Sequence, residues 1–359
     1  MTMQWARRRF LGAGLASMAL PALSQQIPAN VALPFYGPPD FMQGAWRRWY
    51  VPRAQEFVQR AQGLVAALST ACAAPAADTA ALQAARMAWG EAALAFGRLS
   101  AVSVGPQLQR RSTRQIDFAP TRPELIRRAI ATAPADLAAL ERVGTPARGL
   151  PALEWLLWSQ PPAPGTPGCR FATLLAENVL AEARALEQAF GALGAATPDP
   201  DDEAADQAAA VAMAELVNQW VGGVERLRWP FMDKPLRSAP KGKPPAYPRA
   251  TSGLSAQAWA AQWQGLRALA VAADNAVPQP GKDLVTLETY MRGRGLNPLA
   301  DRWAATVRRV DDAIAAARPD APASVQAATK AVAGLKQLAE AELAPALDIR
   351  IGFSDADGD

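Results

Sequence analysis

The sequence places a carboxylate in an apolar setting and lacks the side chain that most often works beside one. Glu154 lies within the apolar run Leu150–Trp158, where an unpaired charge would be costly to bury. The 359-residue chain contains no histidine, the usual acid or base near neutral pH and the commonest metal ligand. This absence excludes Ser-His-Asp and Cys-His catalysis, HExxH zinc sites and histidine-ligated haem. Catalysis must therefore rest on carboxylates, Lys, Tyr, Ser or Arg, and a metal site on oxygen ligands or, less favourably, on cysteine.

Two interpretations of Glu154 follow from its setting. In the first, it is a carboxylate that binds a ligand or a metal. In the second, it forms a structural ion pair with an arginine such as Arg148, Arg114 or Arg249. The sequence leaves both open, because each would satisfy a buried charge.

A second group of carboxylates lies at the C-terminus. Asp355, Asp357 and Asp359 match the start of a calcium-binding loop, D-x-D-G-D. The chain ends before a glutamate at the twelfth position, which excludes an EF-hand in its usual form. These hard oxygen ligands could contribute to a Ca²⁺ or Fe³⁺ site, or they could belong to a solvated, frayed tail.

The third candidate group precedes a predicted helix. Tyr247, Arg249 and Ser252 end a stretch, 230–252, that is rich in proline and lysine and has no helical period. Long irregular segments in compact domains are often functional. One interpretation is anion binding by the helix N-terminus with help from the arginine. The other is plain helix capping by Ser252 or Ser255.

The N-terminal residues indicate export. Three arginines at positions 7–9 precede an apolar run, Leu11–Leu23, and small residues follow at the spacing that a signal peptidase accepts. Phe10 and Leu11 follow the arginines as in twin-arginine signals. We predict a signal peptide over residues 1–24 that is cleaved near Ser24. The alternative is an uncleaved membrane anchor, but the run is too short to span a bilayer.

Cleavage would leave a nearly neutral protein in the periplasm of a bacterium with two membranes. The formal charge of +4 would fall by the three arginines to +1, and we expect no membrane span and no nucleic-acid partner. An oxidising compartment favours a disulfide between Cys72 and Cys169, which would contribute about 4 kcal/mol in the chain-entropy model. The alternative is two separate buried thiols.

The elements that must position these groups are helices. The chain is rich in Ala, Leu, Gln, Glu and Arg, and strand-like alternation with hairpin turns is absent from the sequence. Apolar residues recur at helical spacing over 57–68, 82–96, 171–193, 213–227, 259–270, 299–314 and 325–339. Such helices bury their apolar faces only against one another. We therefore predict an all-α fold of two packed helical bundles, 25–200 and 201–359, divided in the loop at Thr197–Asp202.

Three segments together resemble the imelysin family, also classed as peptidase M75-like. The family carries a GxHxxE motif at the start of a helix; Gly149 and Glu154 match it, whereas Pro151 occupies the histidine position. The segment 351–359 is similar to the family's C-terminal Gly-Phe…Asp-Gly-Asp signature. The segment 249–255 resembles an Arg-Ser-Gly-x-Ser stretch, with residues inserted after the arginine.

Weaker matches extend the resemblance from about Trp46 to the C-terminus. They are Trp89, Gly105-Pro106 and the segment 114–118, after which Ala119-Pro120-Thr121 replaces the family's Trp-Pro-Asp. Proline cannot replace the motif's histidine as a ligand, although it suits the first turn of a helix, where its missing N–H is no loss.

The resemblance implies two helical bundles with the motif and the tail near a shared cleft. It also implies a periplasmic or surface role that is often associated with iron uptake. The ligand-binding candidates are Gly149, Glu154, Arg249, Ser252, Asp117 and Arg114. The metal-ligand candidates are Glu154, Asp355 and Asp357, with iron or calcium as the ion.

Three functions are therefore compatible with the sequence. The first is an exported, non-proteolytic binding component for iron or another metal, which takes a metal ion or small ligand and works with other periplasmic or outer-membrane uptake components. The second is a metallopeptidase of the M75 type, although this chain has no histidine ligands to offer. The third is a structural or interaction module that has lost the ancestral site.

Overall fold

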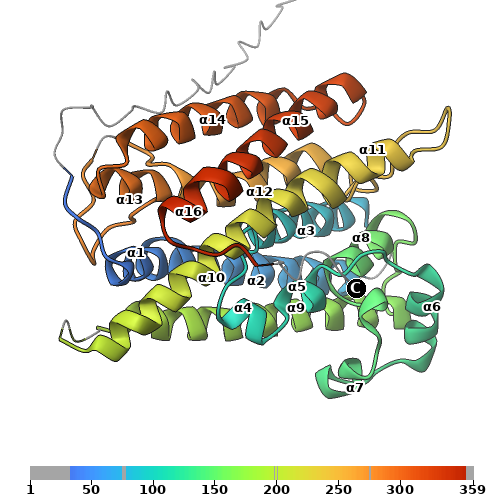
Figure 1. The fold of residues 1–359 in the computed structure, drawn as a ribbon. Helices are drawn as coiled ribbons and strands as arrows, with labels where there is room; N and C mark the ends of the chain where they lie inside the picture. The colour runs from blue at the N-terminus through green and yellow to red at the C-terminus, as the bar shows by residue number, and fades with distance from the viewer. Residues whose placement is uncertain (1–32, 75–77, 198, 200, 275, 353–359) are drawn as a thin grey trace, which may run out of the picture.

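A computed structural model describes residues 33–352 except 75–77, 198, 200 and 275 (Figure 1). Every regular element in these residues is helical, which confirms the all-α prediction. None of the helices in the described part of the chain is both long enough and apolar enough to cross a membrane. The predicted signal at 1–24 and the three C-terminal aspartates, Asp355, Asp357 and Asp359, lie outside the described residues.

Each of the seven apolar stripes forms a long helix. These are α2 (Val51–Ala73), α3 (Thr79–Leu99), α9 (Pro167–Ala195), α10 (Glu203–Arg228), α12 (Ser255–Ala270), α14 (Asn297–Ala316) and α15 (Pro322–Leu338). The shorter helices are α1 (Pro38–Ala45), α4 (Pro106–Gln109), α5 (Ser112–Ile116), α6 (Pro123–Thr132), α7 (Leu137–Glu141), α8 (Gly149–Trp158), α11 (Lys234–Ser238), α13 (Leu287–Gly293) and α16 (Ala344–Ala346).

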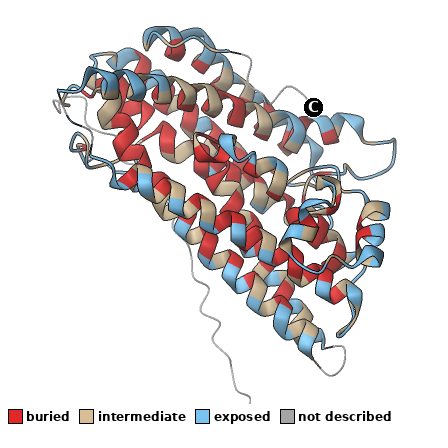
Figure 2. Ribbon diagram, turned by 90° about the horizontal axis from the view of Figure 1, so that it is seen from below, coloured by how far each residue is buried: buried red, intermediate tan, exposed pale blue. Residues whose placement is uncertain are grey.

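The long helices pack in two groups that meet along α3. Helix α2 packs on α3 and α9, whereas α14 packs on α15, and α12 contacts α3, α10 and α14. Figure 2 shows the buried residues along the faces that the helices turn towards one another. The loop between α9 and α10 contains the division proposed at residue 200, and that division into two bundles stays a prediction.

Side-chain caps fix where α3 and α10 begin. Asp78 accepts the N–H of Ala80 at 2.8 Å at the start of α3, and Asp202 accepts the N–H of Ala204 at 2.9 Å at the start of α10. Each cap satisfies a backbone donor that the first turn leaves without a partner. The acidic loop before α10 therefore supplies the cap of that helix.

Four fully buried tryptophans hold the helices at fixed positions. Trp89, Trp220, Trp259 and Trp303 each donate the indole N–H to a backbone carbonyl of another segment. Burying an indole is favourable when its N–H finds such a partner. Each of them lies in one of the predicted apolar stripes.

One expectation about an irregular segment is wrong in part. The helical path of α10 continues past Pro230 through a π turn, Trp229–Asp233, into α11. A proline inside a helix removes one hydrogen bond and clashes with the preceding turn, but a π turn widens the helix locally and accommodates it. The irregular segment therefore begins at residue 239, after α11, and ends at residue 254, before α12.

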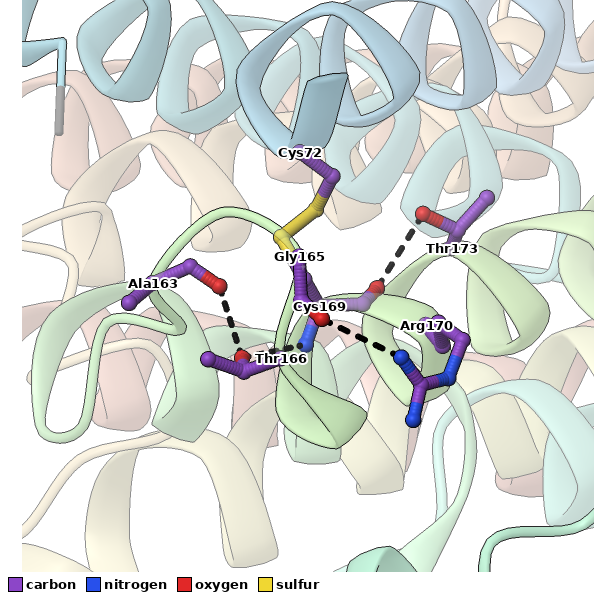
Figure 3. Close-up of a disulfide and its surroundings, with 7 residues drawn as sticks. All are labelled: Cys72, Ala163, Gly165, Thr166, Cys169, Arg170 and Thr173. Carbon is purple, nitrogen blue, oxygen red and sulfur yellow. Dashed lines mark hydrogen bonds between the residues drawn. A yellow bond between two sulfur atoms is a disulfide. The ribbon is translucent and has the colours of Figure 1, made fainter. Parts of the chain in front are cut away.

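The disulfide predicted between Cys72 and Cys169 is present and joins the end of α2 to the start of α9 (Figure 3). The two Cα atoms lie 5.5 Å apart, and 97 positions separate the cysteines in sequence. Thr166 caps α9 by accepting the Cys169 N–H at 3.4 Å, and the Gly165 N–H donates to the Cys72 carbonyl at 3.3 Å. The bridge therefore anchors the loop that follows α8.

Candidate functional site

The glycine of the motif sets the start of α8. Gly149 has φ +72°, a left-handed conformation that side chains disfavour. A Cβ atom there would lie 2.3 Å from the carbonyl oxygen of Ile116, at the end of α5. The α5 backbone therefore approaches α8 so closely that only glycine fits. Pro151 follows within the first turn of α8, where a missing N–H breaks no helical hydrogen bond.

Glu154 is buried, and hydrogen bonds engage both oxygens of its carboxylate. Its Oε1 accepts the backbone N–H of Ser252 at 2.9 Å and the hydroxyl of the same serine at 2.7 Å. Its Oε2 lies 3.5 Å from Nη1 of Arg249. Of the arginines considered as partners, Arg249 is the one that pairs with Glu154. The carboxylate thus ties α8 to the irregular segment before α12.

Arg249 is the centre of this cluster. Its guanidinium pairs with Glu154 on one side and donates from Nη2 to Oδ1 of Asp117 on the other. Its central carbon also lies 5.3 Å from the ring centroid of Trp89, a cation–π contact. The residue has φ +64°, which is strained for a residue with a side chain. The hydrogen bond from the Leu254 N–H to its carbonyl, at 3.0 Å, closes the turn that holds this conformation.

A second, half-buried arginine lies close to Asp117. Arg226, on α10, donates from Nη2 to the carbonyls of Ser100 and Ala101, the latter at 3.1 Å, at the end of α3. Burial lowers the pKa of Arg226 to about 10, and the Asp117 carboxylate opposes that shift. No sequence pattern singled out this residue, because it flanks the apolar stripe of α10 and looks like a surface arginine.

We call Glu154, Ser252, Arg249, Asp117 and Arg226 the Glu154 network. It contains two carboxylates and two guanidinium groups, so its formal charges cancel. The Asp117 side chain is 21% exposed, against 8% for Arg249 and 9% for Glu154. Asp117 is therefore the more accessible of the two acidic groups in the network.

Other residues singled out by the sequence lie elsewhere or act differently. Arg114 is exposed, and its guanidinium lies over the ring of Phe118, 5.8 Å from the centroid. Tyr247 packs edge-on against Trp259, with ring centroids 5.0 Å apart. Helix α12 has no side-chain cap, so the capping interpretation of the two serines is wrong.

The serines instead shape the segment before α12. Ser255 donates its hydroxyl to the carbonyl of Pro248 at 2.8 Å, whereas Ser252 binds the carboxylate of Glu154. The Ser255 bond folds the segment before α12 back upon itself, and the Ser252 bond ties that segment to α8.

The described residues of the network do not fit a resident metal ion. Nowhere in the described part of the chain do three or more Cys, Asp or Glu residues gather as a metal site. Glu154 has both oxygens engaged, and the guanidinium of Arg249 lies between the two carboxylates. A cation would have to displace that arginine. The proposed contribution of Asp355 and Asp357 lies outside the described residues.

Comparison with known proteins assigns the family. The model of the imelysin family, peptidase M75, matches residues 50–348. The chain belongs to the imelysin family. In this chain Pro151 stands where the family's GxHxxE motif has histidine. Proteins with curated descriptions gave no match.

Two solved structures share the imelysin-like fold. An imelysin-like protein from Psychrobacter arcticum 273-4 superposes with a TM-score of 0.69 at 18% identity, covering 90% of this chain and 100% of its own. A protein from Parabacteroides distasonis ATCC 8503, described as an iron-regulated protein A precursor, gives 0.67 at 13% identity, covering 88% and 96%. At these identities the likeness concerns the fold.

Proposed function

We propose that this imelysin-family protein is an exported, non-proteolytic binding component that works in the uptake of iron or another metal. Three observations support the proposal: the family, the description of the Parabacteroides relative as an iron-regulated precursor, and the N-terminal arginines followed by an apolar run. The periplasm is the compartment that fits a twin-arginine-like signal together with a disulfide.

One observation carries the non-proteolytic part. The carboxylate of Glu154 is held by Ser252 and Arg249 in a chain that has no histidine. A zinc peptidase needs ligands that leave one position open for water and a carboxylate that can take a proton from that water. Here the carboxylate of the motif is committed to two other groups, so the arrangement orders a loop and offers no base.

The ligand, in this proposal, is a metal ion or a small molecule that enters beside Asp117. At the more exposed side of the Glu154 network, Asp117 supplies a carboxylate that accepts hydrogen bonds, and Arg249 supplies a guanidinium that donates them. Iron or calcium would be bound as cargo through oxygen ligands, with Asp355 and Asp357 as further donors, and other periplasmic or outer-membrane components would receive it. Gly149 and Glu154 hold the geometry, whereas Arg114 lies close in sequence to Asp117 and would act from the surface.

Elemental analysis of the protein purified from its native periplasm tests the proposal. We expect iron or calcium above the level of a matched control protein, together with saturable binding of Fe³⁺ or Ca²⁺ by titration. Protein that retains and binds neither ion would contradict the metal-binding part. Recovery of the chain from the cytoplasm alone, with residues 1–24 uncleaved, would contradict export.

Two variants distinguish a direct role of Glu154 in ion binding from a general loss of stability. Glu154→Gln keeps an acceptor for Ser252 and removes the charge that faces Arg249. Glu182→Gln is a matched control, because Glu182 is also buried and accepts from an arginine, Arg110, and a serine, Ser112. If only Glu154→Gln weakens ion binding, the network takes part in it. If both variants bind ions equally, the proposed role of Glu154 is wrong.

The complete engagement of Glu154 favours a second candidate, an interaction module without a ligand site. In that case Glu154→Gln would lower stability and leave the metal content of the protein unchanged. Cleavage of a protein substrate that is sensitive to chelators and lost in Glu154→Ala would instead indicate the metallopeptidase alternative.

A further inference from the structure

A pocket of about 810 Å³ lies between the second half of α9 and the first half of α10, away from the Glu154 network. Two residues of α4, Pro106 and Gln109, also line it, and Figure 1 shows where α4, α9 and α10 lie in the fold. Its walls are mostly apolar and include Pro106, Leu193 and Val211, whose side chain is exposed. The volume is within the range of small-molecule sites, about 300–1,000 Å³. We call it the α9–α10 pocket.

An aromatic cluster forms the inner wall of this pocket. Trp46 lines it, and the ring centroid of Trp46 lies 5.1 Å from that of Tyr50 and 6.0 Å from that of Phe190. The rings of Tyr50 and Phe190 stack at 4.9 Å behind it. Tyr50 is anchored through its hydroxyl, which donates to the carbonyl of Val102 at 3.0 Å. The indole is thus presented on a rigid support.

One carboxylate faces the same pocket without a counter-ion. Oε1 of Glu215, on α10, accepts the N–H of Gly105 at 2.8 Å. Among the described residues no lysine or arginine forms an ion pair with Glu215. Burial and, secondly, the negative charge of Glu215 raise the pKa of Tyr50 well above its ordinary value. A half-buried carboxylate among apolar walls is unfavourable unless a cation compensates it.

We propose that the α9–α10 pocket binds a small organic cation with apolar substituents, of the alkylammonium class. The carboxylate of Glu215 supplies the opposite charge, the part of the largely buried Trp46 indole that lines the pocket supplies an aromatic contact for the cation, and the alanine-rich walls accept the substituents. A bare metal ion does not fit, because a single carboxylate and an indole are not a ligand set for one. An anion is disfavoured by the charge of Glu215.

The pocket is a separate site from the Glu154 network. Eleven residues separate Glu215 from Arg226, which is about 16 Å along α10. The second site is therefore independent of the function proposed above, and the failure of either proposal leaves the other untouched.

The test compares two ligands of the same shape that differ in charge. Choline carries a trimethylammonium group, and 3,3-dimethyl-1-butanol replaces the nitrogen by carbon and is neutral. We expect choline to bind and to shift the indole N–H resonance of Trp46, assigned with Trp46→Phe, in heteronuclear spectra of the full chain. The neutral alcohol should bind about tenfold more weakly or not at all.

Three variants identify the groups responsible. Glu215→Gln keeps the acceptor for Gly105 and should weaken choline binding about tenfold, to the level of the alcohol. Glu124→Gln removes an exposed carboxylate from α6 and should leave the affinity unchanged. Ala208→Phe fills the groove from an exposed position, so that the fold tolerates it, and should abolish binding.

Three results would overturn the proposal. The first is equal affinity for the charged and the neutral ligand, which would mark a purely apolar groove. The second is unchanged choline binding in a folded Glu215→Gln protein. The third is self-association that buries the pocket and is abolished by Ala208→Phe, because a second copy of the chain would then be the occupant.

Discussion

Replacing Gly149 by alanine is the sharpest test of how the motif supports the site. The added Cβ would lie 2.3 Å from the Ile116 oxygen and 2.8 Å from its carbon, both of which are backbone atoms that cannot rotate away. The positive φ adds a conformational term of roughly 1–2 kcal/mol. Forcing the backbone apart adds about 1–3 kcal/mol. We therefore expect a loss of about 2–5 kcal/mol in the free energy of unfolding.

A second glycine separates the conformational cost of a positive φ from the cost of the steric clash. Gly295 has φ +77°, and no neighbouring atom lies within 4 Å of the position that a Cβ would take there, so Gly295→Ala carries the conformational term alone. Both substitutions restrict the unfolded chain to the same extent, so that effect cancels in the comparison. Urea denaturation of the two variants should place Gly149→Ala lower by about 1–3 kcal/mol.

The same substitution should also disturb the Glu154 network. Asp117 directly follows Ile116, so a displacement of the Ile116 carbonyl moves the carboxylate that binds Arg249. Equal destabilisation in the two variants would refute the argument that a close approach of α5 requires glycine at position 149.

The remaining predictions concern three separate contacts. Ser252→Ala removes the hydroxyl that donates to Glu154 but keeps the backbone donor, so urea denaturation should show a loss of about 1–3 kcal/mol, and an unchanged stability would contradict the role of this bond. Replacing Cys72 and Cys169 together by serine opens a loop with a sequence separation of 97 and should lower the free energy of unfolding by about 4–5 kcal/mol, with reductant affecting only the parent protein. Burial and, secondly, Asp40 raise the pKa of Tyr36 to about 12 from its ordinary 10, so its contribution to stability is complete below pH 10 and is lost as the pH rises through 12. Absorbance titration of tyrosinate, with Tyr36→Phe as reference, should show this group ionising late, and ionisation near pH 10 in the folded protein would contradict it.

Periodicity was sufficient to predict the long helices. The stripe of α10, for example, steps through Met213, Val217, Trp220 and Val224, and each of these side chains is buried. The prediction ended the helix too early because Pro230 is a strong helix breaker in isolation. The π turn that accommodates it, and the α10 helix before it, both pack against α15, a contact that local sequence does not describe.

The sequence predicted four of the five members of the Glu154 network but not how they pair. The motif comparison selected Glu154, Arg249, Asp117 and Ser252, and the structure brings these four together. It did not specify which arginine pairs with Glu154, because three candidates were compatible with the chain. Arg226 was not selected at all, because its hydrogen bonds depend on the approach of α10 to the end of α3.

The balance of charge in the Glu154 network has a consequence for how quickly a ligand could arrive. Opposite charges that cancel within a small volume leave only a short-range field, which falls away before a diffusing ion can be steered by it. Capture at this site would then depend on random encounter and on the opening of the contacts around Asp117. The rate of association should therefore respond little to ionic strength, unlike that of a binding protein which attracts its ligand from a distance.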